Sequence, residues 1–210
     1  MEEKTVGKID EMILAVDREH LFESELLTFQ GVLIDPREIR RIMKKFKKYK
    51  EVRRGDAEED LTLKQPIPYA IIRRGEEVFV YKRLKGGGEK RLHNRLSIGI
   101  GGHMNRVNDI HNWNSNLMIN FFRELYEELE ISNVSKPLEP QIVGLINDDD
   151  DDVGIFHIGI LMVVDLPEDA EVIVRETEKL DGYWLRIKDL TKSGLFEALE
   201  TWSQFAVEVL

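Results

Sequence analysis

The chain has 210 residues, of which 42% are hydrophobic and 33% charged, and its formal net charge is −10. This composition is typical of a globular protein, and the acidic balance argues against general affinity for nucleic acid. The absence of cysteine excludes disulfides, thiolate nucleophiles and cysteine-ligated zinc. The acidic N-terminus has only a short apolar run at residues 12–16, so we expect no signal peptide, no membrane span and a cytoplasmic location.

Two short apolar runs, residues 12–16 and 31–34, predict strands near the N-terminus. Asp35 and Pro36 then predict the start of a helix, with aspartate as the N-cap and proline at the first helical position. The segment 53–68 is polar and contains glycine and two prolines, which predicts a loop.

The predicted basic helix, residues 37–54, contains ten Lys or Arg residues and two Glu. Its apolar stripe consists of Ile39, Ile42, Met43 and Phe46. A cover helix with a solvated basic face explains this pattern. Two alternatives stay open: a surface that binds RNA or another anionic partner, and a basic face that steers an anionic substrate toward a nearby site.

The middle and the end of the chain mix strands and helices without a regular alternation. Residues 69–84 predict a hairpin around Arg-Gly-Glu-Glu, and residues 96–104 predict a short strand that ends in paired glycines. The other predicted elements are a Gly-rich basic loop at 85–95, a polar loop at 105–116, strands at 141–146, 153–164, 171–174 and 183–187, and a final amphipathic helix at 193–209. The pattern favours an α+β fold with a mixed sheet between layers of helices.

The stretch "RELYEELEI", residues 123–131, places four glutamates and one arginine on a predicted helix. Its apolar stripe consists of Leu117, Met118, Phe121, Phe122, Leu125 and Leu129. Glu124, Glu127 and Glu128 fall on one narrow arc beside that stripe, where like charges repel by a few tenths of a kcal/mol per pair. Either solvent or a hard divalent cation such as Mg²⁺ or Mn²⁺ relieves this repulsion.

A Gly-Gly pair at residues 101–102 precedes this helix. Glycine lets the backbone approach a ligand closely and leaves its carbonyl oxygens accessible. The strand, loop and helix from residue 97 to residue 131 could therefore surround a divalent metal from several sides.

The segment "GGHM…RELYEELEI" resembles the signature of the Nudix hydrolases, which hydrolyse diphosphates. That signature reads Gly, five residues, Glu, seven residues, then Arg-Glu-apolar-any-Glu-Glu-any-Gly-apolar. The matching positions are Gly102, Arg123, Glu124, Leu125, Glu127, Glu128 and Ile131. The stretches "QPIPY", "SIGIGGHM", "INDDD" and "VGIFHIG" resemble a MutT-like branch of predicted phosphoesterases with no assigned substrate.

The sequence departs from the signature in three places. Ser115 stands where the family has its upstream glutamate, and Glu130 stands where it has its late glycine. Twelve residues instead of five separate Gly102 from Ser115, so the loop carries an insertion.

The resemblance implies a Nudix α/β/α sandwich with a mixed sheet over residues 66–210. Residues 1–65 would form an N-terminal extension that packs on the same domain. Glu124, Glu127 and Glu128 would bind Mg²⁺ or Mn²⁺, together with the carbonyl of Gly102, and Arg123 would orient the glutamates.

The implied activity is metal-dependent hydrolysis of a diphosphate linkage in a nucleoside diphosphate derivative or a similar small molecule. One alternative is a Nudix domain that binds a nucleotide without catalysis, and another is an RNA-binding protein that uses the basic helix. Nucleic acid is the less favoured partner because of the acidic charge balance. A homodimer through apolar residues of the extension is neither required nor excluded.

Further candidates surround this core of the site. Arg83, Arg91 and His103 are the predicted substrate-binding residues, and the cations Lys82 and Arg95 could also clamp phosphates. Weaker candidates are Glu176, Glu178 and Asp148–Asp152 as extra acidic ligands, His93 near the loop, and Trp113 as a stacking platform for a base. We expect His157 to be structural and Trp184 to lie in the core.

Overall fold

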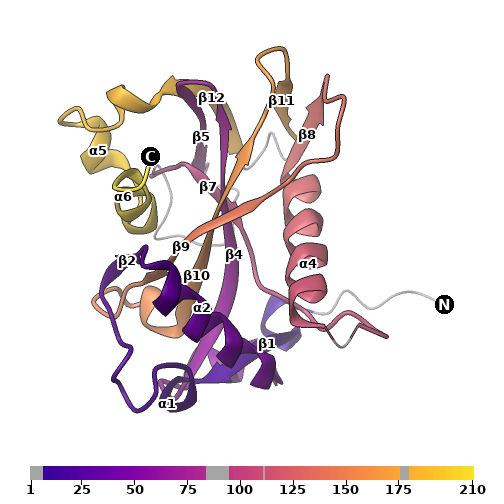
Figure 1. Cartoon of the computed structure of the whole chain (residues 1–210), viewed down its shortest axis with the longest axis vertical. Helices are drawn as coiled ribbons and strands as arrows, with labels where there is room; N and C mark the ends of the chain where they lie inside the picture. The colour runs from indigo at the N-terminus through magenta and orange to yellow at the C-terminus, as the bar shows by residue number, and fades with distance from the viewer. Residues whose placement is uncertain (1–6, 84–94, 111, 176–179) are drawn as a thin grey trace.

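A computed structural model of the chain describes residues 7–83, 95–110, 112–175 and 180–210. Within these residues, the main path of a ten-stranded mixed sheet is β12-β5-β4-β10-β9-β2, and the other four strands, β1, β3, β6 and β7, pair off this path. Strands β8 and β11 form a separate two-stranded sheet. Helix α4 lies on one side of the large sheet, and α5 and α6 lie on the other (Figure 1). The architecture is the predicted α/β/α sandwich with a mixed sheet.

The two central strands are β4 (Leu63–Arg74) and β10 (His157–Asp165), which pair in parallel. The other strands are β1 (Met12–Asp17), β2 (Gly31–Leu33), β3 (Lys50–Arg53), β5 (Glu77–Arg83), β6 (Leu96–Ser97), β7 (Gly99–Gly101), β8 (Leu129–Ser132), β9 (Gln141–Asn147), β11 (Glu171–Val174) and β12 (Leu180–Arg186). The α-helices are α1 (Arg18–Leu21), α2 (Pro36–Lys45), α3 (Arg54–Ala57), α4 (Trp113–Glu128), α5 (Leu195–Ala198) and α6 (Thr201–Val207).

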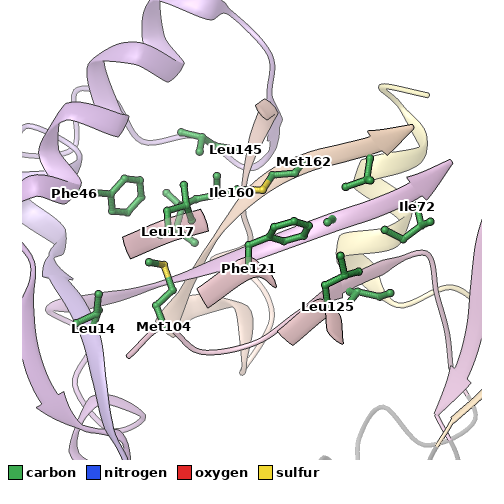
Figure 2. Packing of buried hydrophobic residues seen from close by; sticks show 14 of the residues in the cluster. Leu14, Phe46, Ile72, Met104, Leu117, Phe121, Leu125, Leu145, Ile160 and Met162 are labelled. Atoms are coloured by element: carbon green, nitrogen blue, oxygen red, sulfur yellow. The ribbon is translucent and has the colours of Figure 1, made fainter. Parts of the chain in front are cut away.

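The central strands separate two hydrophobic cores, because successive side chains of a strand point to opposite faces. In β10, Ile160 and Met162 pack toward α4, whereas Leu161 and Val163 pack toward α6. Figure 2 shows the first core, where Phe121 of α4 lies among the strand residues. Because β4 and β10 are buried along nearly their whole length, the alternation of their side chains between the two cores holds a helical layer on each face.

The N-terminal segments are part of this architecture. Strand β1 pairs with β4, and β2 pairs with β9 at the end of the sheet path. Leu14, Ile42 and Phe46 are fully or almost fully buried in the core that contains α4. Figure 2 shows Leu14 and Phe46 in this core. The backbone N–H of Leu14 also donates to the carbonyl of Met104 at 2.7 Å. The boundary predicted between residues 65 and 66 falls inside β4.

Several local predictions are confirmed. The carboxylate of Asp35 accepts from the backbone N–H groups of Arg37 and Glu38, and Pro36 opens α2. The hairpin is β4–β5, with Gly75 in its turn at a φ of 54°. The strands predicted near the N-terminus and at 141–146, 171–174 and 183–187 correspond to β1, β2, β9, β11 and β12.

The predicted basic helix is too long. Helix α2 ends at Lys45, a short 3-10 turn follows at Phe46–Lys48, and residues 50–53 form β3. Strand β3 pairs with β1, so sheet hydrogen bonds replace the helical ones that the basic pattern favoured.

The loop predicted for residues 53–68 is also wrong. Residues 53–68 contain α3 and the first half of β4. Pro66 and Pro68 favoured a loop because proline lacks a backbone donor, yet both lie in register with β10.

Two helix boundaries differ as well. Helix α4 begins at Trp113, inside the predicted polar loop, because Asn112 caps it through the N–H groups of Asn114 and Ser115. It ends at Glu128 instead of continuing to Ile131, because β8 pairs with β11. The strand predicted to begin at residue 153 begins at His157, after a short 3-10 turn.

The final helix predicted for residues 193–209 is two short helices, α5 and α6. The chain straightens between them, where Leu199 forms a bridge to Leu96 and the N–H of Glu200 donates to the carbonyl of Leu96. Among the described helices, none combines the length and the apolar character that a membrane crossing requires.

The burial of α2 in the α4 core predicts that Ile42→Ala destabilises the whole fold. Ile42 is fully buried, so truncation leaves a cavity and lowers the free energy of unfolding by about 3 kcal/mol. Ile34→Ala is the matched control, because Ile34 is 57% exposed and its loss costs less than about 1 kcal/mol. Denaturant unfolding measures both, and equal small effects would contradict a shared core.

Candidate metal and substrate site

The glutamate-bearing end of α4 is positioned by the apolar face of the helix. Trp113, Leu117, Phe121 and Leu125 recur every four residues, and all are buried. This face fixes the rotation of the helix, which leaves the side chain of Glu124 15% exposed and that of Glu127 59% exposed. Glu128 is half-buried.

The paired glycines bring the backbone after β7 against this helix. A Cβ built on Gly102 would lie 2.3 Å from both Cδ and Oε2 of Glu124. A Cβ on Gly101 would lie 2.1 Å from the carbonyl oxygen of Pro68. At residue 101 a side chain would collide with the backbone, and at residue 102 it would displace the Glu124 carboxylate, which lies directly against the Gly102 backbone.

Arg123 holds the acidic residues and the glycine loop together. Its Nη1 lies 2.8 Å from Oε1 of Glu124 and 3.5 Å from Oε1 of Glu127. Its Nη2 donates to the carbonyl of His103 at 2.8 Å and to Oδ1 of Asn105 at 3.0 Å. The guanidinium therefore bridges the α4 carboxylates and the loop that follows β7.

The electrostatics of Glu124 reflect its half-enclosed position. Burial raises the pKa of the Glu124 carboxyl above its ordinary value, the positive charge of Arg123 opposes this rise, and the negative charge of Glu127 adds to it. A bound cation would act in the same direction as Arg123. The site thus favours a positive charge near Glu124.

Among the described residues, no group of three or more acidic or histidine side chains is gathered closely enough to hold a metal ion. In this arrangement Arg123 is shared between Glu124 and Glu127, and like charges on neighbouring turns repel. The donors nevertheless suit a hard divalent ion, because they are carboxylate oxygens beside a backbone carbonyl. The absent side chain of Gly102 leaves the space in which the Glu124 carboxylate lies.

His103, Gln65 and His157 form a polar cluster beside the glycine loop, in which Gln65 and His157 are buried and His103 is half-buried. Nδ1–H of His157 donates to the carbonyl of Val153 at 2.7 Å, so Nε2 of the neutral ring accepts. His103 Nε2 lies 3.2 Å from that atom and 2.8 Å from Oε1 of Gln65. Burial lowers the pKa of His157 to about 4 and the pKa of His103 well below its ordinary value.

The burial of His157 and its hydrogen bond to Val153 are those expected of a structural residue, and its role stays a prediction. The ring of His103 contacts that of His157, and the backbone carbonyl of His103 accepts a hydrogen bond from Arg123. Its predicted contact with substrate stays a prediction.

The structure describes only some of the other candidates. Arg91, His93, Glu176 and Glu178 lie outside the described residues, and of Arg83 only the backbone at the end of β5 is described. The side chain of Lys82 is half-buried. Arg95 donates to the carbonyl of Glu197, toward α5.

The aspartates after β9 bind the N-terminal segments. Gln30 donates to Asp148 at 2.7 Å, and Asp149 forms ion pairs with Arg18 and with the fully buried Lys64. These contacts tie Asp148 and Asp149 to the packing of the N-terminal segments.

The proposed stacking role of Trp113 is wrong. Its ring is 3% exposed, stacks on Phe46 at 5.0 Å and contacts Tyr49 at 5.8 Å. Trp184 packs against Phe79, as expected of a core residue, and the guanidinium of Arg74 lies over its ring.

Sequence reasoning missed four polar residues of this site: Glu11, Gln65, Asn105 and Asn120. Asn105 and Asn120 join the glycine loop to α4, Glu11 contacts Asn105, and Gln65 contacts His103. Asn105 directly follows "GGHM", which marked the loop as part of the site. The other three are brought there by tertiary contacts that no local pattern encodes.

An α/β/α sandwich in which a Gly-Gly loop lies against the glutamates of an Arg-Glu-x-x-Glu-Glu helix defines the class of Nudix hydrolases. No protein-family model matches the chain. The chain is 48% identical to protein YmaB of Bacillus subtilis (strain 168) over 206 residues, which cover 98% of this chain and 100% of YmaB.

Solved structures give the fold relationship. Tm1382, a candidate Nudix hydrolase, is 28% identical, has a TM-score of 0.73 and is matched over 95% of this chain and 97% of its own. A MutT Nudix hydrolase from Burkholderia pseudomallei is 16% identical, with a TM-score of 0.43 over 70% of this chain and 97% of its own, which is too distant to support an argument. The chain belongs to the Nudix hydrolase family.

The buried His157 predicts a loss of stability in acid. Between the unfolded pKa of about 6.5 and the folded pKa of about 4, the unfolded chain binds a proton that the folded chain excludes. The free energy of unfolding therefore falls as the pH falls through this window, by about 2 kcal/mol between pH 7 and pH 5 from this residue.

Urea unfolding of the native chain and of His157→Asn at both pH values tests this prediction. Asparagine can keep the donor to the carbonyl of Val153 but does not titrate. The variant should lose about 2 kcal/mol less on acidification. An identical pH dependence in the two proteins would contradict the assignment.

Proposed function

We propose that the protein is a metal-dependent hydrolase that cleaves a diphosphate linkage in a nucleoside diphosphate derivative. The observation that carries this proposal is the direct apposition of Gly102 and Glu124, with Arg123 shared between Glu124 and Glu127. This arrangement joins the two halves of the family signature in space despite the longer loop between them.

Glu124, Glu127, Glu128 and the carbonyl of Gly102 would hold Mg²⁺ or Mn²⁺. When bound, such an ion supplies Lewis acidity toward a phosphoryl oxygen and lowers the pKa of a bound water. The carboxylates lie on consecutive turns of one helix, which lets small rotamer changes bring their oxygens toward one point. Oxygen ligands of this kind suit either ion.

The other residues of the chain bind and orient. Arg123 orients Glu124 and Glu127 through Nη1, and its Nη2 is anchored on the glycine loop. Arg83, Arg91 and His103 are proposed to contact the substrate. The guanidinium groups of Arg83 and Arg91 match the bidentate geometry of a phosphate.

The departures from the signature leave this apparatus in place. Ser115 lies exposed in the first turn of α4, more than two turns before Glu124. Glu130 lies in β8 opposite Ile173, with its side chain exposed. Neither residue lies on the arc formed by Glu124, Glu127 and Glu128.

The basic N-terminal segment gives no comparable support for RNA binding. Helix α2 ends at Lys45, and Arg41 and Lys45 both form ion pairs with Glu23. The continuous basic helix on which that alternative rested is therefore interrupted, and part of its charge is neutralised.

Formation of the phosphate monoester products from nucleoside diphosphate derivatives, dinucleoside polyphosphates and nucleotide sugars, separated by chromatography, tests the proposal. We expect turnover with Mg²⁺ or Mn²⁺ and none after chelation. Glu127→Gln and Glu128→Gln should each lose activity roughly a hundredfold or more, since several kcal/mol of charge stabilisation disappear.

Glu130→Gln is the matched control, because it makes the same chemical change two residues beyond the signature glutamates. It should keep the native rate. Nucleotide binding without turnover of any compound would support a non-catalytic binding domain instead. Equal losses in all three variants would show that charge on this segment, and not metal ligation, controls activity.

A further inference from the structure

The loop after the paired glycines is tied to the N-terminal segment through Asn105. Its Nδ2 donates to Oε1 of Glu11 at 2.8 Å and to the carbonyl of Met12 at 2.9 Å. The neighbouring backbone hydrogen bond from Leu14 to Met104 holds β1 against the same loop. The donor side of the Asn105 amide is thus fully used by residues that lie outside the family signature.

The acceptor side of the same amide faces the catalytic helix. Oδ1 of Asn105 accepts from Nη2 of Arg123 at 3.0 Å. Asn120 is 1% exposed and forms two hydrogen bonds with the Asn105 backbone. Its Oδ1 accepts from the N–H of Asn105 at 2.8 Å, and its Nδ2 donates to the carbonyl of Asn105 at 2.9 Å. Asn105 therefore has little freedom to move relative to α4.

We infer that Asn105 is a positioning residue for Arg123, and that Glu11 and Met12 of the N-terminal segment belong to the apparatus that orients the metal-binding glutamates. The inference deepens the proposed function and rests on it. It assigns to the first strand region a role in metal binding, in addition to its part in the sheet.

The planar guanidinium of Arg123 links the Asn105 contact at Nη2 to the position of Nη1 beside the glutamates. Because the guanidinium of Arg123 is planar and rigid, anchoring Nη2 on Asn105, on the carbonyl of His103 and, at 3.3 Å, on Oδ1 of Asn120 restricts where Nη1 points. Nη1 then lies between Glu124 and Glu127, at 2.8 and 3.5 Å. Without the Asn105 contact, Nη2 keeps only the carbonyl of His103 and Oδ1 of Asn120, so Arg123 shifts more easily toward one carboxylate and competes with a cation for it.

An amide is needed at residue 105 because both of its sides are used. An aspartate keeps the acceptor for Arg123 but loses both donors toward Glu11 and Met12. An aliphatic residue loses all three hydrogen bonds. The same contacts predict that Glu11→Gln is tolerated, because glutamine retains an Oε1 that accepts the hydrogen bond from Asn105.

The experiment measures Mn²⁺ affinity by electron paramagnetic resonance, together with kcat and KM, on the full chain. Asn105→Ala should weaken Mn²⁺ binding about 10- to 100-fold and lower kcat to a similar extent, as removal of residues behind metal ligands does. The KM of the substrate should change less than about threefold. Glu11→Ala should act in the same direction with a smaller effect, and Glu11→Gln should restore most of the loss.

Glu51→Ala is the matched control. Glu51 of β3 forms an exposed ion pair with Arg106 at 3.0 Å, so it also joins the N-terminal segment to the loop, but it does not contact Arg123. This variant should keep native Mn²⁺ affinity. A loss equal to that of Glu11→Ala would overturn the inference, because any loosening of the loop would then have the same effect.

A double-mutant comparison separates positioning from a merely structural role. If Asn105 acts through Arg123, Asn105→Ala should change Mn²⁺ affinity less than about threefold in an Arg123→Ala background. Equal effects in both backgrounds would overturn the inference, as would native affinity in a folded Asn105→Ala. If Asn105→Ala does not fold, the Mn²⁺ affinities of Glu11→Ala and Glu11→Gln decide. A loss in the alanine variant that the glutamine variant restores supports the inference, and equal affinities in the two variants overturn it.

The metal readout also separates this inference from the proposed function. A native chain that binds Mn²⁺ but hydrolyses none of the compounds would overturn the hydrolase, while the affinities of the variants would still test Asn105. A native chain that binds no Mn²⁺ would overturn both.

Discussion

The parallel pairing of β4 and β10 is the interaction on which the rest of the structure depends. It runs in unbroken register from the Gln65–His157 pair to the Arg73–Asp165 pair. The alternation of its side chains creates the two cores, and therefore decides that α4 lies on one face and α6 on the other. Its first pair also brings Gln65 and His157 together beneath the glycine loop, where His103 joins them. Support for the site and separation of the layers thus come from one strand pair.

The features that the sequence predicted best depend on local periodicity. The arc of Glu124, Glu127 and Glu128 follows from helical geometry. Glycine at residue 102 indicates a close approach of the backbone to another group, which in the structure is the Glu124 carboxylate. Both motifs belong to one continuous segment, so the fold class and the family could be inferred before any contact was known. Helix boundaries were predicted less well, because competing strand pairs decide where α2 and α4 end.

The polar support of the site could not be predicted in the same way. Glu11 is separated from Asn105 by most of the first half of the chain, and Asn120 has an amide that any exposed helix could carry. Trp113 shows the reverse difficulty: in a polar stretch it suggested a binding platform, yet Phe46 and Tyr49 from the N-terminal region bury it. A residue's function here depends on which distant segment covers it, and composition alone does not contain that information.

The placement of the N-terminal strands has a consequence for association between molecules. β1 pairs with the beginning of β4, and β2 pairs with β9 along the last edge of the sheet path. Both covered strands are rich in buried apolar residues. If the N-terminal segment detached, rows of unpaired N–H and C=O groups beside apolar side chains would become templates for another chain. The segment therefore protects the protein against edge-to-edge aggregation, and its detachment would turn a local opening into a route to self-association.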